Sequence, residues 1–292
     1  MTRSGGTRGQ RPGASERRVP VGVWLLAVLA VAFLTLPVAA LLVRVPWTRF
    51  VDLIGSGAVL TPLWISLQTS IMATAIALAL GVPLAWVLAR GGLRRPDLWR
   101  VPVLVPVLLP PVVAGVALLA ALGRNGLVGG LLEDWFGLVL PFSMAGVVLA
   151  QTFVALPFVV LPVEAALRNA DPGPEDVAAV LGAGRWRIVR EVGLPSIAPA
   201  VAAGALLAWA RAVGEFGATV TFAGSLPGRT QTLPTAVYQA LESDRGAALV
   251  MSVVLVLLAL LVLIALRARW WPWARPAPAP ASRSATSTHA DS

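Results

Sequence analysis

The chain of 292 residues contains no cysteine and no lysine, and its single histidine, His289, lies near the C-terminus. Without cysteine there are no disulfides and no thiolate-ligated metal sites, and one histidine is too few for a histidine-based zinc site. The absence of lysine excludes the phosphate-binding loop Gly-x-x-x-x-Gly-Lys-Ser/Thr of nucleotide hydrolases. We therefore expect a chain that is not an enzyme, that binds no metal or cofactor and that does not itself hydrolyse ATP.

Charged residues are also scarce. They make up 13% of the chain, against roughly 25% in an ordinary soluble domain, whereas hydrophobic residues make up 57%. This composition indicates a membrane protein. The formal net charge of +9 could indicate a nucleic-acid partner, so the placement of the basic residues decides how the charge is interpreted.

Six apolar stretches are long enough to form membrane helices, which need about 20 residues to cross roughly 30 Å of hydrocarbon. The fold class expected is therefore an all-α membrane protein with six transmembrane helices within residues 20–269. Residues 1–19 are expected to form a disordered basic N-terminus, and residues 270–292 an interfacial tryptophan cluster with a disordered tail. The expected spans are 21–43, 66–89, 101–122, 143–163, 198–222 and 247–266.

The placement of arginine predicts the orientation of these spans. If the N-terminus is cytoplasmic, 17 of the 23 arginines fall in cytoplasmic segments, five fall outside, and Arg211 lies within a span. This asymmetry agrees with the positive-inside rule and predicts that both termini are cytoplasmic. Because the arginines mark cytoplasmic edges, they explain the net charge, and no nucleic-acid partner is expected.

The expected cytoplasmic loop between the fourth and fifth spans, residues 164–197, has the pattern of two short helices joined by a bend. Pro174 suits the first turn of a helix, and the two acidic residues that follow favour its positive end. Gly182 can end this helix in a sharp turn. Residues 185–192 then form the second helix, which Leu194-Pro195 is expected to end before the membrane.

This loop resembles the EAA motif of the permease subunits of bacterial ABC importers. The family pattern is Glu-Ala-Ala, three residues, Gly, nine residues, Ile, one residue, Leu-Pro. Aligned on Gly182, the pattern places residues 176–178 at the triplet, where Asp replaces Glu and Val replaces the first Ala. In that family the loop docks in a cleft of the ATPase subunit. The resemblance implies ATPase coupling for Asp176, Val177, Ala178, Leu181, Gly182, Ala183, Val192, Leu194 and Pro195.

A literal Glu-Ala-Ala triplet begins at Glu164, but no glycine follows that glutamate after six residues, so we set this triplet aside. The alternative to a docking loop is an ordinary amphipathic helix that lies on the membrane surface.

The fifth span contains an ionisable pair, Arg211 and Glu215. Such residues are costly in a membrane and face protein or a water-filled path, and their spacing of one helical turn allows them to pair. The pair either neutralises itself within the helix bundle or lines a gate between two permease subunits. The glycines nearby would allow close approach of another helix. The candidate translocation path or gate consists of Arg211, Gly214, Glu215, Phe216 and Gly217.

Further stretches resemble the molybdate branch of the ABC importer permeases, which is close to the sulfate branch. They are Leu108–Gly115, Gly123–Gly129, Leu156–Val160, Ala210–Val220 and Gly228–Tyr238. The block Gly214–Ala218 within them is shared with the sulfate permeases. The resemblance implies the type I permease fold, a bacterial plasma-membrane location and import of a tetrahedral oxyanion, either molybdate or tungstate. The alternative within the family is a permease for sulfate or thiosulfate.

The resemblance also implies an assembly. Its partners are a second copy of the chain in a homodimer, two ATPase subunits that use ATP and Mg, an extracytoplasmic oxyanion-binding protein and membrane lipid. A more remote alternative is an ion-coupled secondary transporter that uses Arg211 and Glu215 as its coupling site. Arginines of the outer loops, Arg124, Arg229 and Arg245, either attract an anion or an acidic protein lobe or are ordinary solvated loop residues.

Overall fold

The computed structural model describes residues 20–270, with side chains described to residue 265. The expected basic N-terminus, 1–19, and all but Trp270 of the expected tryptophan cluster and tail, 270–292, therefore lie outside the described residues. The chain divides into two compact units, Met1–Val45 and Pro46–Ser292. The described part of the first unit is the helix α1 (Val21–Arg44). Its apolar side chains are exposed along its whole length, as a helix that faces lipid requires.

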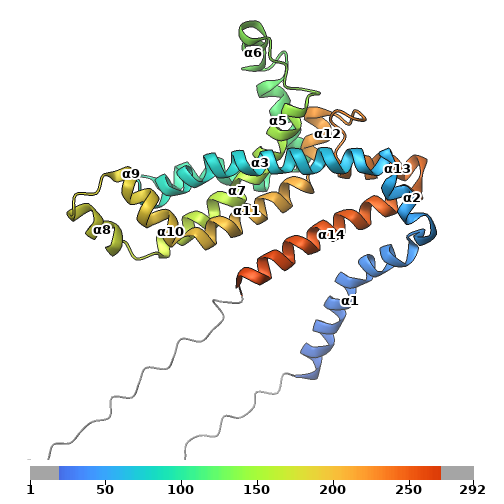
Figure 1. The fold of residues 1–292 in the computed structure, drawn as a ribbon, viewed down its shortest axis with the longest axis horizontal. Coiled ribbons are helices and arrows are strands. Elements are labelled where there is room, and N and C mark those ends of the chain that lie inside the picture. Colours follow the sequence, from blue (N-terminus) through green and yellow to red (C-terminus); the bar gives the residue numbers. More distant parts are fainter. Residues whose placement is uncertain (1–19, 271–292) are drawn as a thin grey trace, which may run out of the picture. The chain divides into compact units, whose positions relative to one another are not determined.

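The second unit is helical throughout its described part, where no strand occurs (Figure 1). Two short turns supplement the helices, a 3-10 turn at Trp47–Arg49 and a π-helical turn at Val189–Gly193. The helices are α2 (Phe50–Gly55), α3 (Gly57–Arg90), α4 (Pro96–Leu108), α5 (Pro111–Leu122), α6 (Gly129–Phe136), α7 (Met144–Asn169), α8 (Gly173–Val180), α9 (Arg185–Ile188), α10 (Leu194–Ser196), α11 (Ala198–Val213), α12 (Gly217–Ala223), α13 (Leu233–Ser243) and α14 (Arg245–Trp270).

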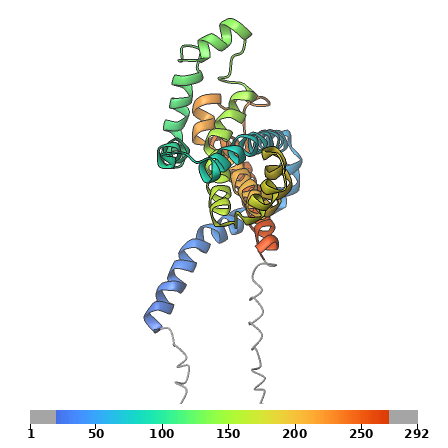
Figure 2. The same cartoon turned by 90° about the vertical axis from the view of Figure 1, so that its left-hand side faces the viewer.

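The centre of the second unit is the bundle of α3, α7 and α11, which lie side by side in Figures 1 and 2. Small side chains line the contacts between these helices, among them Ala73, Ala155 and Ala208, all fully buried. A Cβ atom at Gly81 would lie 3.0 Å from Val159 Cγ1. Small residues let apolar helices approach closely enough for van der Waals packing, which is the main attraction between helices in lipid.

Four helices of the described chain are long and apolar enough to cross a membrane, and two bent helix pairs raise the number to six if each pair is one span. The third expected span, 101–122, is broken into α4 and α5, whose axes differ by 118°. The break lies at Leu109–Pro110, where both residues are extended. Successive prolines explain it, because proline lacks an N–H group and disfavours a helical residue before it.

The other spans also differ in detail from those expected. The helix α3 begins at Gly57 rather than Ser66, and α7 continues to Asn169 rather than ending at Val163. The fifth expected span, 198–222, is divided into α11 and α12 at Gly214–Phe216. The mean hydropathy of each segment identified it correctly as apolar. That average does not show where polar residues continue a helix or where a glycine interrupts one.

The helices α5 and α12 pack against each other beside the bundle, and α6 lies beyond α5 (Figure 2). Their contact leaves no room for side chains at two glycines. A Cβ atom at Gly115 would lie 2.6 Å from Thr221 Cβ, and one at Gly217 would lie 2.6 Å from Pro111 Cβ. The break in the third span therefore lies directly against the break in the fifth.

Candidate functional site

Residues 170–197 form an exposed helical segment that we call the helical loop, whereas residues 164–169 complete α7. Asp171 Oδ1 accepts a hydrogen bond of 3.0 Å from the Gly173 amide, and α8 begins there. The helix ends at Val180, and Gly182 follows with a φ of +83°. This left-handed conformation favours glycine, so the expected bend at Gly182 is present.

The tip of the helical loop exposes apolar side chains. Val180 is 88% exposed and Leu181 is 81% exposed, and Val177 and Trp186 are exposed as well. No residue of α8 is buried. The helix α8 belongs to none of the candidate membrane spans among the described residues. Apolar side chains exposed on such a segment are typical of a surface that another molecule covers.

The nine expected coupling residues lie along both arms of this loop. The residues nearest the bend at Gly182 form the tip of the loop or lie beside that tip. Val192 and Leu194 are half-buried at the base of the loop. The Leu-Pro pair does not end the second helix as expected. The π-helical turn Val189–Gly193 runs on into α10, and the chain bends at Ile197 instead. A π-turn accommodates Pro195, which lacks the N–H group that a regular turn needs.

The base of the loop is fixed against α3. A Cβ atom at Gly193 would lie 2.0 Å from Cη2 of Trp86, so the indole ring lies directly over the glycine backbone. Gly193 is buried and Trp86 is half-buried. The second arm of the loop is thereby held against a membrane-spanning helix.

At the break in the fifth span, Arg211 Nη1 and Glu215 Oε2 form an ion pair, as the spacing predicts. Glu215 is 1% exposed, and its other oxygen accepts a hydrogen bond of 2.8 Å from the Ala218 amide at the start of α12. The carboxylate thus neutralises the arginine and satisfies a free helix N–H group. Arg211 and Phe216 are half-buried, Gly214 is exposed and Gly217 is buried.

A second group of charged residues, which the sequence analysis did not identify, lies where α4 and α7 meet. Glu164 is 4% exposed, and its Oε1 accepts hydrogen bonds from Arg100 Nε at 2.8 Å and Arg168 Nε at 2.9 Å. Asp97 pairs with Arg100. We call these four residues the Glu164 network. The spacing of Glu164 and Arg168, one helical turn apart, could have predicted that they pair. The contact of Glu164 with Arg100 joins distant segments, so no local sequence pattern indicates it.

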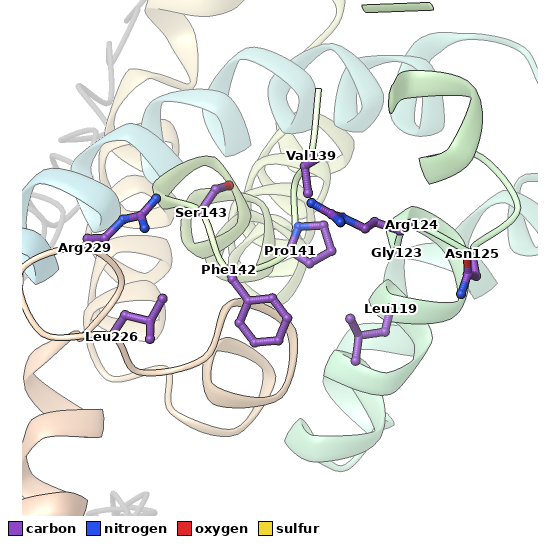
Figure 3. A pocket seen from close by; sticks show the side chains of 10 residues that line it. All are labelled: Leu119, Gly123, Arg124, Asn125, Val139, Pro141, Phe142, Ser143, Leu226 and Arg229. Atoms are coloured by element: carbon purple, nitrogen blue, oxygen red, sulfur yellow. The ribbon is translucent and has the colours of Figure 1, made fainter. Parts of the chain in front are cut away.

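A pocket of about 630 Å³ lies at the N-terminal end of α7 (Figure 3), whereas the helical loop follows the C-terminal end of that helix. Arg124 and Arg229 stand on opposite sides of it, with the ring of Phe142 between them. Arg229 is exposed, and Arg124 Nε lies 3.8 Å from Glu133. Phe142 has a φ of +56°, a strained conformation for a residue other than glycine. We call this site the arginine pocket.

Residues 81–269 match the protein family described as "Binding-protein-dependent transport system inner membrane component". The protein named "Molybdenum transport system permease protein ModB" of Mycobacterium tuberculosis is 45% identical over 237 residues, which cover 81% of this chain and 89% of that protein. The protein of the same name from Escherichia coli K12 is 40% identical over 182 residues, covering 62% and 80%. A "Probable sulfate transport system permease protein cysT" of Chlorokybus atmophyticus is 34% identical, covering 80% and 83%.

Two solved structures resemble the fold. A bacterial ABC transporter for import of the acidic polysaccharide alginate has a TM-score of 0.64 at 19% identity, covering 85% of this chain and 94% of that one. An inward-facing MetNI methionine ABC transporter has a TM-score of 0.54 at 23% identity, covering 72% and 92%. These likenesses concern the fold alone. They confirm the expected all-α membrane fold of the type I importer permeases.

Proposed function

The chain belongs to the family of inner-membrane components of binding-protein-dependent transport systems, and from this membership we propose that it is the permease of an ATP-driven importer of molybdate or the similar tungstate ion. The observation that carries the proposal is the helical loop, whose exposed apolar tip surrounds Gly182 at the end of the bundle. The names of the relatives at 45% and 40% identity support molybdate as the cargo.

The motor of this importer is a separate ATPase that binds the helical loop, in two copies for a homodimer of the chain. The exposed side chains Val180, Leu181 and Trp186 would be buried in a cleft of that subunit, which binds ATP and Mg. This arrangement requires the loop to be cytoplasmic. The asymmetric distribution of arginine supports that orientation and, with it, the expectation that both termini are cytoplasmic.

Transport follows from the position of the breaks in the third and fifth spans. When the ATPase subunits close, they displace the helical loop and the bundle attached to it. Because the breaks lie against each other at Pro111 and Gly217, a shift of α4 and α5 moves the segment that holds Arg211 and Glu215. We assign this segment to the gate between two permease subunits.

The extracytoplasmic binding protein, in this proposal, contacts the arginine pocket. Arg124 and Arg229 present positive charge from two separate segments, and apolar residues such as Leu119 and Leu226 line the space between them. Such a surface suits an acidic segment of a protein, because the pocket of about 630 Å³ is far larger than one tetrahedral anion. Charge complementarity would steer the loaded binding protein to this face.

The proposal is tested in membrane vesicles that contain the chain with its ATPase and binding protein. Uptake of molybdate should stop with vanadate and persist when ion gradients are dissipated. The reverse pattern would indicate an ion-coupled secondary transporter. Competition by tungstate but not by sulfate supports a molybdate importer. Strong competition by sulfate supports the second candidate function, a sulfate importer, which the relative at 34% identity favours.

A further inference from the structure

The Glu164 network lies between the helical loop and the bent third span, and the proposed function leaves it without a role. Glu164 is buried in α7 and receives hydrogen bonds from Arg100 of α4, at 2.8 and 2.6 Å, and from Arg168 one turn further along α7. Two guanidinium groups thus share one carboxylate oxygen. Rigid arginine forks fix direction as well as distance in such contacts.

Hydrogen bonds continue from this network to the helical loop. Arg168 Nη2 donates to the Leu88 carbonyl of α3 at 3.2 Å. Two residues further along α3, Arg90 Nη2 donates to the Ala170 carbonyl at 3.1 Å and to Glu175 Oε1 of α8 at 3.4 Å. Charged side chains therefore connect α8, α3, α7 and α4 in sequence, at the end of the bundle where the loop attaches.

The same connection extends from α4 to the gate. The helix α4 ends at the break before α5, and Pro111 at the start of α5 lies against Gly217 at the start of α12. Glu215 caps α12 and pairs with Arg211. A displacement of α4 relative to α7 must therefore change the packing at the candidate gate.

Stability alone gives little reason for a buried carboxylate at this position. The helix α7 already buries apolar residues along its length, including Val159, Val160 and Val163 in the turn before Glu164. A buried ion pair adds little stability compared with well-packed apolar residues, because desolvation offsets the attraction. Apolar contacts between helices permit sliding, whereas a shared carboxylate holds α4 and α7 in one register.

From this geometry we propose that Glu164 is a positioning residue that makes α4 move together with α7 when the ATPase displaces the helical loop. The proposal rests on the proposed function, since it requires a motor at the loop. The new proposal adds to that function a specific route, in which motion reaches the gate through the carboxylate of Glu164 and the guanidinium of Arg100.

The test uses the absence of native cysteine in this chain, so that each copy of it carries spin labels only at two introduced sites; ATPase and binding protein without reactive cysteines complete the complex. Leu98→Cys in α4 and Ser243→Cys in α13 are suitable because both residues are exposed. In the complete complex with ATPase and binding protein, vanadate trapping should change the distance between the labels. The additional substitution Glu164→Gln should abolish this change while the ATPase still co-purifies, and import should fall about tenfold, a typical coupling effect.

Three comparisons make the outcome decisive. Glu242→Gln, an exposed carboxylate of α13, is the matched control and should behave as the parent protein. Glu164→Asp, which keeps a carboxylate, should restore part of the vanadate-induced change. Arg100→Lys removes the guanidinium group but keeps the positive charge, at a residue that is not fully buried. It therefore tests the proposal if Glu164→Gln fails to fold. We expect it to reduce the vanadate-induced change in label distance as Glu164→Gln does.

The proposal is overturned if Glu164→Gln or Arg100→Lys shows the full vanadate-induced change and imports at the parent rate. A parent protein that shows neither a vanadate-induced change nor import would instead contradict the proposed function. The two failures are therefore distinguishable.

Discussion

Gly182 illustrates how a single backbone angle can decide the shape of the proposed docking surface. Its φ of +83° reverses the chain between α8 and α9, and a Cβ atom there would meet nothing within 4 Å. Space therefore does not select glycine at this position. The backbone conformation does, because the left-handed region costs other residues about 1–2 kcal/mol.

We predict that Gly182→Val leaves membrane insertion intact, weakens co-purification of the ATPase and uncouples import. The measurements are the yield in the membrane, the ATPase bound per permease and the rate of anion uptake. Gly184→Val is the matched control, since Gly184 is also free of neighbours but has an extended backbone with a φ of −64°. Normal ATPase binding and uptake by Gly182→Val would show that the loop is not the docking site.

The pair of Arg211 and Glu215 gives a second prediction at this scale. Glu215→Gln leaves a guanidinium without its partner inside a span, and loss of one partner of a buried pair costs about 3–5 kcal/mol. We expect a clear drop in thermal stability for Glu215→Gln, and recovery of stability in the double variant Arg211→Gln, Glu215→Gln. Thermal denaturation in detergent measures both.

Uptake by the double variant separates the two interpretations of this pair. If the charges serve only to neutralise each other, a stable double variant imports at the normal rate. If Arg211 acts at the gate, import falls although stability is recovered. We expect the second result, because Arg211 is half-buried rather than enclosed.

At the scale of elements, the arginine pocket is formed by the segments that precede α6, α7 and α13. We predict that Arg229→Glu reduces stimulation of the ATPase by the binding protein, most strongly at low salt, because the steering field is screened as ionic strength rises. Arg245→Glu is the control, as Arg245 is exposed but does not line the pocket. Equal effects of the two substitutions would indicate a general field rather than a site.

The sequence predicted those elements that depend on local patterns. The bend at Gly182 and the pairing of Arg211 with Glu215 follow from residues one or two turns apart, and both are present. The breaks in the third and fifth spans were not predicted, because hydropathy continues across Pro110 and Gly214. The contact of Arg100 with Glu164 was not predicted either, since it depends on how α4 packs against α7.

Glu164 also shows why a literal motif can mislead. Its Glu-Ala-Ala triplet matches the letters of the family pattern, but the residue is buried in α7 with two arginines. The degenerate triplet that begins at Asp176 lies in α8, directly before the exposed bend. Spacing relative to the glycine selected an exposed segment, whereas the literal triplet begins at a buried residue, and ATPase contact at the exposed segment stays a prediction.

At the scale of the whole molecule, the two proposed partner sites of this permease lie far apart. The helical loop and the arginine pocket lie at opposite ends of α7, which has 26 residues and is therefore about 39 Å long. The candidate gate lies between these two sites along the bundle. In the proposed function, each of the two ends binds a different kind of partner.

The most direct test of the proposed function is import into proteoliposomes that contain the purified chain and its ATPase, with the binding protein added outside. We expect accumulation of radioactive molybdate only when ATP and Mg are enclosed and the binding protein is present, with inhibition by tungstate. Accumulation without ATP or without the binding protein, or transport of sulfate in place of molybdate, would contradict it.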